Sequence, residues 1–243
     1  MLYAPAAERE QSPPAIASTL FDAYHQWFEV RNANTPALRE EVYRLRYQVY
    51  CCENQFENPE EHIQHLEMDG FDNRSIHSLI VERSSGSAIG TVRLILPDMA
   101  NPNATLPIQQ ICSHPLPASL PLSSSAEISR FAISKKLKRM ADGEIPKELK
   151  CSIVLGLMRA IVQVSLEYGI TDWLAVMEPS LLRLLSRFGI YFTPLGPLVS
   201  YHGMRQPCHA SVDSMLARTR HTHFDLWEFV TESSDSWRAE EAS

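Results

Sequence analysis

The stretch IHSLIVERSSGSAIGTVRLILP, residues 76–97, contains two runs that decide the type of fold. The runs 76–82 and 88–97 are rich in Ile, Val and Leu, and the residues between them are polar and include a glycine. Two β-rich runs joined by a short segment that contains Gly are typical of a β-hairpin. We therefore expect an antiparallel hairpin at this place in the chain.

The segment before the hairpin predicts a short strand followed by an amphipathic helix. Residues 27–31 have the composition of a strand, Thr35 is a suitable helix N-cap, and Pro36 suits the first helical position. Apolar residues then recur at helical spacing at Leu38, Val42, Leu45 and Val49. These features predict a helix over residues 36–51.

The segment after the hairpin predicts a mixed order of strands and helices. A Pro- and Ser-rich loop at 98–125 precedes a strand at 127–134, whose alternation places Ile128, Arg130 and Ala132 on one face. The elements expected next are a long helix at 147–169, a strand at 171–177, a helix at 179–188, short strands at 190–195 and 197–202, and helices at 209–219 and 224–230. This order predicts an α/β (α+β) domain, a mixed sheet with helices on both faces.

The two ends of the chain differ from its middle. Residues 1–17 and 231–243 show no periodicity, so we expect flexible tails on either side of one domain at 18–230. The first residues lack a basic and an apolar segment, and the longest apolar run, 151–166, is interrupted by polar residues. We therefore expect neither a secretory signal nor a transmembrane segment, and we expect a cytoplasmic location.

Composition excludes several classes of protein. With 44% hydrophobic and 21% charged residues, the 243-residue chain is expected to be globular. A net charge of −7 disfavours nucleic-acid binding.

The five cysteines include the adjacent pair Cys51 and Cys52 and no C-x-x-C spacing, which indicates buried thiols rather than a disulfide framework. The isolated pair His62 and His65 is weak evidence for a metal, and we predict none.

Several blocks of this sequence carry a family resemblance. The blocks LRYQVYCCENQF (45–56), EMDGFD (67–72), TVRLILP (91–97) and EISRF (127–131) resemble the acyl-homoserine-lactone synthases and the related long-chain N-acyl amino acid synthases. Residues 176–208 resemble the acyltransferases associated with PEP-CTERM/exosortase systems. The resemblance implies a GNAT fold with a splayed central strand pair. It also implies transfer of an acyl group from a thioester to the amine of a small acceptor.

The resemblance implies roles for a set of charged and aromatic residues. Glu127 is implied as the catalytic general base, directly or through a water, and backbone N–H groups of 127–134 would bind the oxyanion. The residues implied to bind the substrate are Arg46, Tyr50, Phe56, Asp69, Asp72, Arg93, Arg130, Phe131 and His202. Structural alternatives stay open, because these arginines and carboxylates can also pair with one another, and the aromatic residues and His202 can also serve packing.

The identity of the donor depends on two further motifs. Residues 83–88 match a GNAT pyrophosphate signature, but between two strands a hairpin turn explains them sufficiently. The cations implied to dock an acidic acyl carrier protein are Lys135, Lys136, Lys138 and Arg139, although a solvated loop is an equal alternative. We expect no permanently bound cofactor and an acyl-phosphopantetheine thioester as co-substrate, carried by acyl carrier protein or alternatively by CoA. A non-catalytic acyl-binding or scaffolding module is the alternative from another class.

Overall fold

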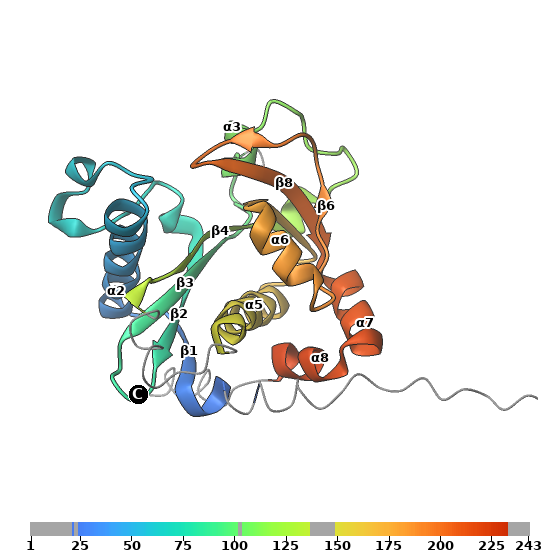
Figure 1. Cartoon of the computed structure of the whole chain (residues 1–243). Coiled ribbons are helices and arrows are strands. Elements are labelled where there is room, and N and C mark those ends of the chain that lie inside the picture. Colours follow the sequence, from blue (N-terminus) through green and yellow to red (C-terminus); the bar gives the residue numbers. More distant parts are fainter. Residues whose placement is uncertain (1–20, 22–23, 102–103, 137–148, 233–243) are drawn as a thin grey trace, which may run out of the picture.

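The computed structural model describes residues 21, 24–101, 104–136 and 149–232. The expected tails, 1–17 and most of 231–243, lie outside this part of the chain, as do Lys138 and Arg139. A sheet of eight strands forms the centre of the molecule (Figure 1). The predicted mixed α/β architecture is confirmed.

The sheet is mostly antiparallel, with one parallel pair at its centre. Its main path runs in the order β1-β2-β3-β4-β5-β8-β6, and β7 pairs with β8. Only β4 and β5 run parallel among the described strands. The strands are β1 (Phe28–Asn32), β2 (Ser75–Glu82), β3 (Ala88–Ile95), β4 (Ser125–Ile133), β5 (Asp172–Met177), β6 (Thr193–Pro194), β7 (Val199–Ser200) and β8 (Met204–Ser211).

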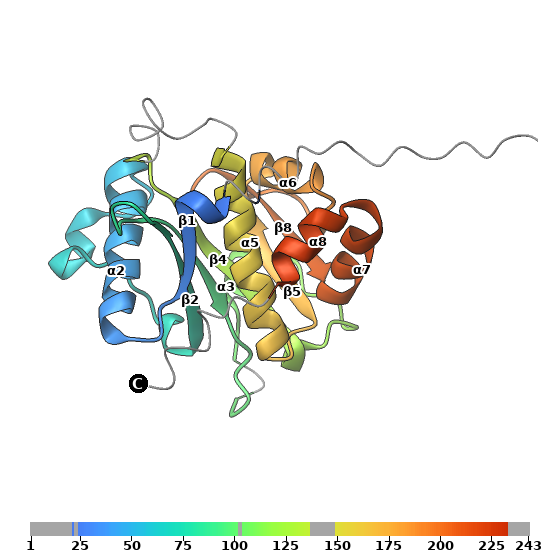
Figure 2. The same ribbon diagram turned by 90° about the horizontal axis from the view of Figure 1, so that it is seen from below.

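Helices cover both faces of the sheet. Figure 1 shows α2 on one face and α5 on the other, and Figure 2 shows α8 beside α5, with α7 packed against α8. The α-helices are α2 (Pro36–Tyr47), α3 (Pro107–Ile111), α5 (Leu149–Glu167), α6 (Pro179–Ser186), α7 (Val212–Thr222) and α8 (Phe224–Thr231). A π-helical turn, Gln48–Glu53, follows α2, and single 3-10 turns lie at Pro59–Glu61, Ile63–His65, Asp72–Arg74 and Leu122–Ser124. Within the described residues, no helix has the length and apolar composition needed to cross a membrane.

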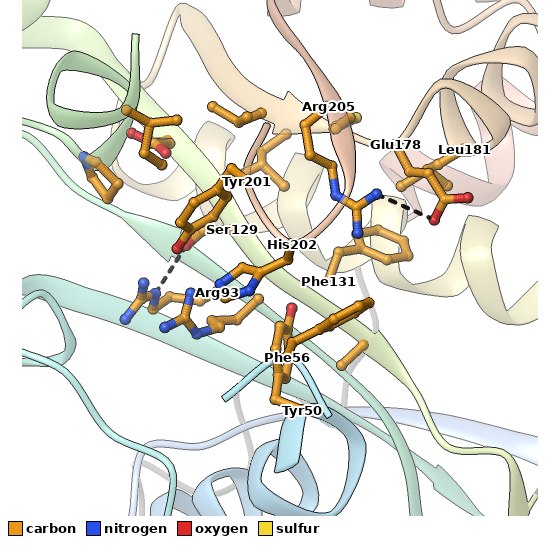
Figure 3. A pocket seen from close by; sticks show the side chains of 18 of the residues that line it. Tyr50, Phe56, Arg93, Ser129, Phe131, Glu178, Leu181, Tyr201, His202 and Arg205 are labelled. Atoms are coloured by element: carbon orange, nitrogen blue, oxygen red, sulfur yellow. Dashed lines mark hydrogen bonds and ion pairs between the residues drawn. The ribbon is translucent and has the colours of Figure 1, made fainter. Parts of the chain in front are cut away.

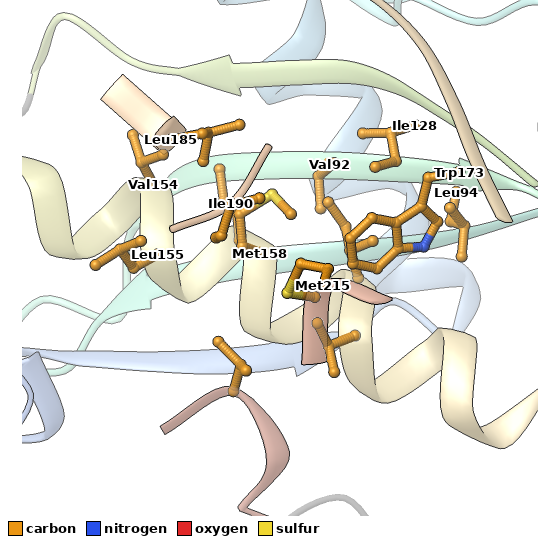
Figure 4. Close-up of a cluster of buried hydrophobic side chains, with 14 of the residues drawn as sticks. Val92, Leu94, Ile128, Val154, Leu155, Met158, Trp173, Leu185, Ile190 and Met215 are labelled. Atoms are coloured by element: carbon orange, nitrogen blue, oxygen red, sulfur yellow. The ribbon is translucent and has the colours of Figure 1, made fainter. Parts of the chain in front are cut away.

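Strand alternation divides the core between the two faces. On β2, Leu79 and Val81 pack with α2, while Ile80 belongs to the cluster around α5. The α5 cluster is the larger one, and Figure 4 shows Trp173 and the α5 side chain Met158 within it. The four α5 residues at helical spacing are all buried: Ile153, Leu157, Ile161 and Val164.

The hairpin and most helices agree with the sequence predictions, whereas the segments 98–125 and 209–219 differ from them. The segment 98–125 contains the short helix α3, and the predicted helix at 209–219 begins only at Val212. Residues 204–211 instead form β8, which pairs antiparallel along the whole of β5. A segment with Pro207 has weak strand propensity, so tertiary pairing overrides the local signal here. Ser211 then caps α7 by accepting a hydrogen bond from Ser214 N–H.

The central parallel pair separates along its length. Strands β4 and β5 are paired from Ser125↔Asp172 to Ile128↔Ala175, while the rest of β4 pairs only with β3. This is the splayed strand pair that the resemblance implied. Its consequence is an unpaired β4 edge in the middle of the sheet.

A β-bulge changes the direction of side chains on β4. Between the pairs Arg93↔Ser129 and Thr91↔Ala132, two β4 residues oppose one residue of β3, and Arg130 has a positive φ of 48°. The predicted alternation is therefore wrong beyond Ser129. Ile128 faces the α5 cluster, whereas Ala132 packs in the α2 cluster.

All five cysteines are free thiols. Cys51 and Cys208 are buried, which agrees with the prediction. Cys52 is exposed, because the backbone turns between adjacent residues of the π-helical segment and only Cys51 points toward the core. The expectation of a buried thiol was wrong for this residue.

Candidate active site

A cleft of about 410 Å³ lies where β4 and β5 separate. Its walls come from the π-helical turn after α2, from α3, from β4 with the end of β5, and from the hairpin of β7 and β8. Figure 3 shows side chains from these segments around the cleft. The cleft is lined by residues from both faces of the sheet. Ile128 and Met177 belong to the α5 cluster, whereas Glu127 and Ser129 lie on the opposite face of β4. The cleft therefore passes between β4 and β5.

Glu127 lines this cleft as a buried carboxyl group. Its Oε2 accepts a hydrogen bond of 2.9 Å from the backbone N–H of Ile108 in α3. Burial raises the pKa of Glu127 to about 8, even though that hydrogen bond and the charge of Arg93 act in the opposite direction. The group is therefore mainly protonated at pH 7, and when it ionises it is a stronger base than an ordinary carboxylate.

Behind the cleft, Arg46 joins α2 to the loop before β2. Its side chain is fully buried, and it donates to Glu67 at 2.5 Å and to Asp72 at 2.7 Å. Breaking a buried pair of this kind by removing one partner costs about 3–5 kcal/mol. Arg46 and Asp72 were expected to bind the substrate, but they do not line the cleft. Their contacts are with each other and with neighbouring charged side chains, which is a structural role.

Arg93 connects this buried group to the cleft. Its Nη1 donates to Asp69 and to Asp72, each at 2.6 Å. Its Nε donates to Ser129 Oγ at 2.9 Å, the contact drawn as a dashed line in Figure 3. Arg93 and Ser129 are register partners on β3 and β4, so the sheet itself holds the guanidinium at the cleft wall.

Arg130 reaches the same carboxylates from β4. Its Nη2 lies 2.9 Å from Glu67 Oε1 and 3.2 Å from Asp69 Oδ2. In a regular strand the residue two positions after Ile128 would face the apolar α5 cluster. The bulge turns Arg130 to the α2 side, where its charge finds partners.

Arg46, Arg93, Arg130, Glu67, Asp69 and Asp72 form what we call the ionic cluster. Burial alone would raise the pKa of Glu67, but Arg46 and Arg130 outweigh it and lower the pKa to about 2. Burial would also raise the pKa of Asp69, but Arg93 and Arg130 outweigh it and lower that pKa to about 2. Three guanidinium groups thus face three carboxyl groups of the cluster, and Glu57 lies 3.6 Å from Arg130 at its edge.

The loop that carries these carboxylates is held by its own backbone. Asp69 Oδ1 accepts the N–H of Phe71 at 2.9 Å, and Asp72 Oδ2 accepts the N–H of Asp69 at 2.7 Å. Such Asx-type contacts hold a turn without help from regular secondary structure. They fix the directions in which both carboxylates point.

An aromatic wall closes one side of the cleft. The α-helix predicted to reach residue 51 changes to π-helical geometry after Tyr47, with Asn54 N–H bonded to Val49 C=O five residues earlier. Tyr50, in this turn, lines the cleft, and its ring lies 5.2 Å from the Arg130 guanidinium and 6.1 Å from the Phe56 ring. π-helical turns of this kind are frequent at functional sites.

The β7–β8 hairpin forms the opposite side of the mouth. His202, at its tip, has a positive φ of 49° and packs 5.5 Å from the Phe56 ring. Its Nε2 lies 3.4 Å from Glu57 Oε1. Burial lowers the pKa of His202, although Glu57 acts in the opposite direction. These contacts join the hairpin to the loop after the π-helical turn.

The structure brings most of the predicted site residues to one place. Those that line the cleft are Tyr50, Phe56, Asp69, Arg93, Glu127, Arg130, Phe131 and His202. Lys135 and Lys136 follow the end of β4, and Lys135 Nζ donates to the Glu53 carbonyl at 2.6 Å. Lys138 and Arg139 lie outside the described residues, so no docking patch can be drawn from the four together.

Sequence reasoning missed three charged residues here. Glu67 is the carboxylate that Arg46 and Arg130 share, and Arg205 and Glu178 lie at the cleft mouth. Glu67 belongs to the acidic run before β2, in which only Glu60 and Glu61 are exposed, so the run marks an acidic segment but does not single out Glu67. Arg205 had no such signal, since its segment was not expected to be a strand. Among the described residues, no group of three His, Cys, Asp or Glu is arranged to hold a metal ion.

Comparisons with known proteins agree with this architecture. Residues 45–142 match the family described as acetyltransferase (GNAT) domain. A comparison with curated proteins by sequence found no match. The matched segment contains β2, β3 and β4, and together with the sheet it identifies the fold as GNAT-like.

Solved structures place the fold more narrowly. The chain is similar to the acyl-homoserine lactone synthase LasI, with a TM-score of 0.60, 21% identity, and coverage of 81% of this chain and 95% of LasI. BjaI, described as a CoA-dependent acyl-homoserine lactone synthase, has a TM-score of 0.56 at 20% identity and covers 86% and 90%. FeeM, an N-acyl amino acid synthase from uncultured soil microbes, has a TM-score of 0.54 at 16% identity and covers 81% and 96%. The chain thus has the fold of these synthases.

Proposed function

We propose that the protein transfers an acyl group, long-chain by preference, from a pantetheine thioester to the amine of a small amino-acid-like acceptor. The observation that carries this proposal is the cleft itself, which passes between β4 and β5 and has the buried carboxyl of Glu127 in its wall. A thioester arm can enter between the separated strands, and an acceptor can approach from the α2 side.

The donor side of the cleft suits a thioester. Beyond Ile128 the edge of β4 has no β5 partner, so its backbone groups are available to a pantetheine arm and to the oxyanion. The apolar side chains Met177, Leu181 and Phe131 line the same cleft and suit an acyl chain. The resemblance to long-chain synthases supports this preference.

The proposed reaction uses Glu127 as the base. Ionised Glu127 accepts a proton from the acceptor ammonium, directly or through a water. The freed amine forms a bond to the thioester carbonyl carbon, the carbon–sulfur bond breaks, and the leaving thiolate takes up a proton. Because the pKa of Glu127 is raised to about 8, the rate should rise with pH through that region.

For the donor, we favour acyl carrier protein over CoA. Residues 83–87 join β2 and β3 as a turn, so the pyrophosphate signature there does not open a helix. The cations after β4, including Lys136, suit an acidic carrier. The CoA dependence described for BjaI supports the alternative donor.

A link between this protein and a PEP-CTERM/exosortase system is supported only by the resemblance of residues 176–208 to acyltransferases of such systems.

The test is an incubation of the protein with acyl carrier protein, CoA and pantetheine thioesters of one acyl chain, together with pooled amino acids. We expect free thiol and a new N-acyl product mass. Glu127→Gln should lower the rate by about 10²- to 10⁴-fold and abolish the rise with pH. Glu82→Gln is the matched control, because Glu82 is also a buried carboxylate but does not line the cleft.

Two results would contradict the proposal. If acyl ligands bind but no thioester is consumed, the protein is an acyl-binding module rather than an enzyme. If Glu127→Gln turns over as fast as the wild type between pH 6 and 9, another group is the base. Charge reversal at Lys135 and Lys136 separates the donors, because it should lower kcat/KM for acyl carrier protein and leave acyl-pantetheine unaffected.

A further inference from the structure

The cleft contains a third guanidinium besides those of Arg93 and Arg130, that of Arg205, whose hydrogen-bonding capacity the protein leaves largely unused. Its Nη1 lies 3.8 Å from Glu178 Oε2 and 3.5 Å from the Met204 carbonyl oxygen. Both separations are long for hydrogen bonds of a guanidinium. Within the described part of the chain, no other hydrogen bond or ion pair is recorded for the Arg205 guanidinium.

Arg205 is held in place in spite of these loose contacts. Its backbone is paired with Val199 in the β7–β8 hairpin, and its guanidinium lies 5.7 Å from the centre of the Phe56 ring. The side chain is 16% exposed. Figure 3 shows it at the cleft with the dashed contact to Glu178. Because the guanidinium is already ordered and has only weak partners, an anion can bind it with little cost of ordering or of breaking contacts.

The other cleft arginines do not have this freedom. Arg93 and Arg130 each bind carboxylates of the ionic cluster at 2.6–3.2 Å. A substrate carboxylate would have to displace one of those partners and leave it unpaired, at a large cost. Displacing Arg205 from Glu178 costs little, because Glu178 is more than half exposed and can be solvated.

We infer that Arg205 binds the carboxylate of the amino-acid-like acceptor and makes the enzyme select a free carboxylate over a carboxamide. The inference rests on the proposed function. A planar guanidinium with unused N–H groups binds a carboxylate through two parallel hydrogen bonds. The Phe56 ring beneath it belongs to the aromatic wall that the resemblance places at the acceptor site. Arg205 is thus a specificity-determining residue outside the charged positions that the resemblance implies.

The test compares an amino acid with its carboxamide as acceptor, at a fixed concentration of one acyl thioester. Arg205→Gln should raise the KM for the amino acid by roughly 10- to 100-fold and leave the KM for the carboxamide unchanged. Arg205→Lys should restore part of the difference, because it keeps the charge but not the fork. Arg218→Gln is the matched control, since Arg218 also lies over an aromatic ring, that of Tyr191 at 5.0 Å, but outside the cleft.

Two kinetic results would overturn the inference. An equal rise in KM for the amino acid and the carboxamide would mean that Arg205 only supports the hairpin. A loss that appears with acyl-CoA but not with acyl-pantetheine would mean that Arg205 binds a donor phosphate instead.

A binding measurement separates this inference from the proposed function. Calorimetry with N-octanoyl glycine and N-octanoyl glycinamide needs no turnover. If the wild type transfers no acyl group but prefers the acid, and Arg205→Gln loses that preference, the proposed reaction fails while the carboxylate site stands. If the wild type binds the two probes equally, the inference about Arg205 is wrong.

Discussion

The two faces of the central sheet are stabilised in different ways. The α5 face is an apolar cluster in which side chains such as Ile80 and Leu94 pack against the helix. The α2 face has a smaller apolar cluster and also buries Arg46 and Arg93 with their carboxylate partners. One sheet thus separates a mostly apolar core, where the buried Arg159 of α5 pairs with Glu232, from a core that contains the ionic cluster.

This difference explains where the cleft can support chemistry. Apolar burial stabilises a fold in proportion to area and has no preferred direction. Ion pairs in a buried site contribute less net stability because desolvation opposes them, but they fix each group in one orientation. Arg93, Arg130 and Asp69 are held in this way at the wall of the cleft. The charged face therefore orients the site, and the apolar face stabilises the domain.

The largest expected effect breaks the charged face. Arg46→Met leaves Glu67 and Asp72 without a shared cation, so the free energy of unfolding should fall by about 3–5 kcal/mol in denaturant titrations at pH 7. Leu157→Ala on the apolar face is the matched core variant and should cost about 2–5 kcal/mol. The expected losses of stability of the two variants overlap in size, so they are distinguished by how each loss depends on pH.

The pH dependence of stability sharpens this comparison. The pKa of Glu67 is lowered from 4.5 to about 2 in the folded state, so its contribution is complete above pH 4.5 and is lost as pH falls toward 2. The destabilisation by Arg46→Met should therefore shrink between pH 5 and 2, because a protonated Glu67 needs no cation. The destabilisation by Leu157→Ala should stay constant over that range. Parallel losses for both variants would contradict the assignment of ionic roles to this face.

A smaller effect is expected where the charged face meets the cleft. Arg130→Ala and Asp69→Asn should each cost about 1.5–3 kcal/mol in acceptor use, measured as a rise in the KM of the acceptor above that of the donor. Arg31→Ala is a control, because this exposed arginine lies on β1 away from the cleft. Lowered melting temperatures with unchanged kinetics of the soluble protein would show that both residues serve only the fold.

The smallest effect is expected on the apolar face. A Cβ added at Gly156 of α5 would collide with the buried Tyr24 ring, so Gly156→Ala should destabilise the protein by about 1–3 kcal/mol in thermal unfolding. Gly70→Ala is the matched control on the charged side, because its added Cβ would meet nothing within 4 Å. Equal stability of the two variants would show that the α5 face can relax where we expect it to be closely packed.

The site was predictable only where local signals existed. The blocks around Tyr50, Asp69 and Glu127 were found from short motifs, and all three side chains line the cleft. Arg205 was not predicted as a site residue, because a strand that contains Pro has no clear local pattern in the sequence. Glu67 was visible only as one carboxylate in an acidic run, and nothing in that run distinguished the buried Glu67 and Asp72 from the other members.

What the sequence by itself determined was the set of local elements. The apolar period of α2 and α5, the Thr35 cap and the β2–β3 hairpin depend on residues within a few positions of one another. The tertiary structure alone decided the bulge at Arg130, the strand β8 and the pairing of the ionic cluster. Arg46 and Glu67 are 21 positions apart, and Arg130 and Glu67 are 63 apart. A buried charge gains its partner only after distant segments meet, so no local pattern in the chain specifies which carboxylate that will be.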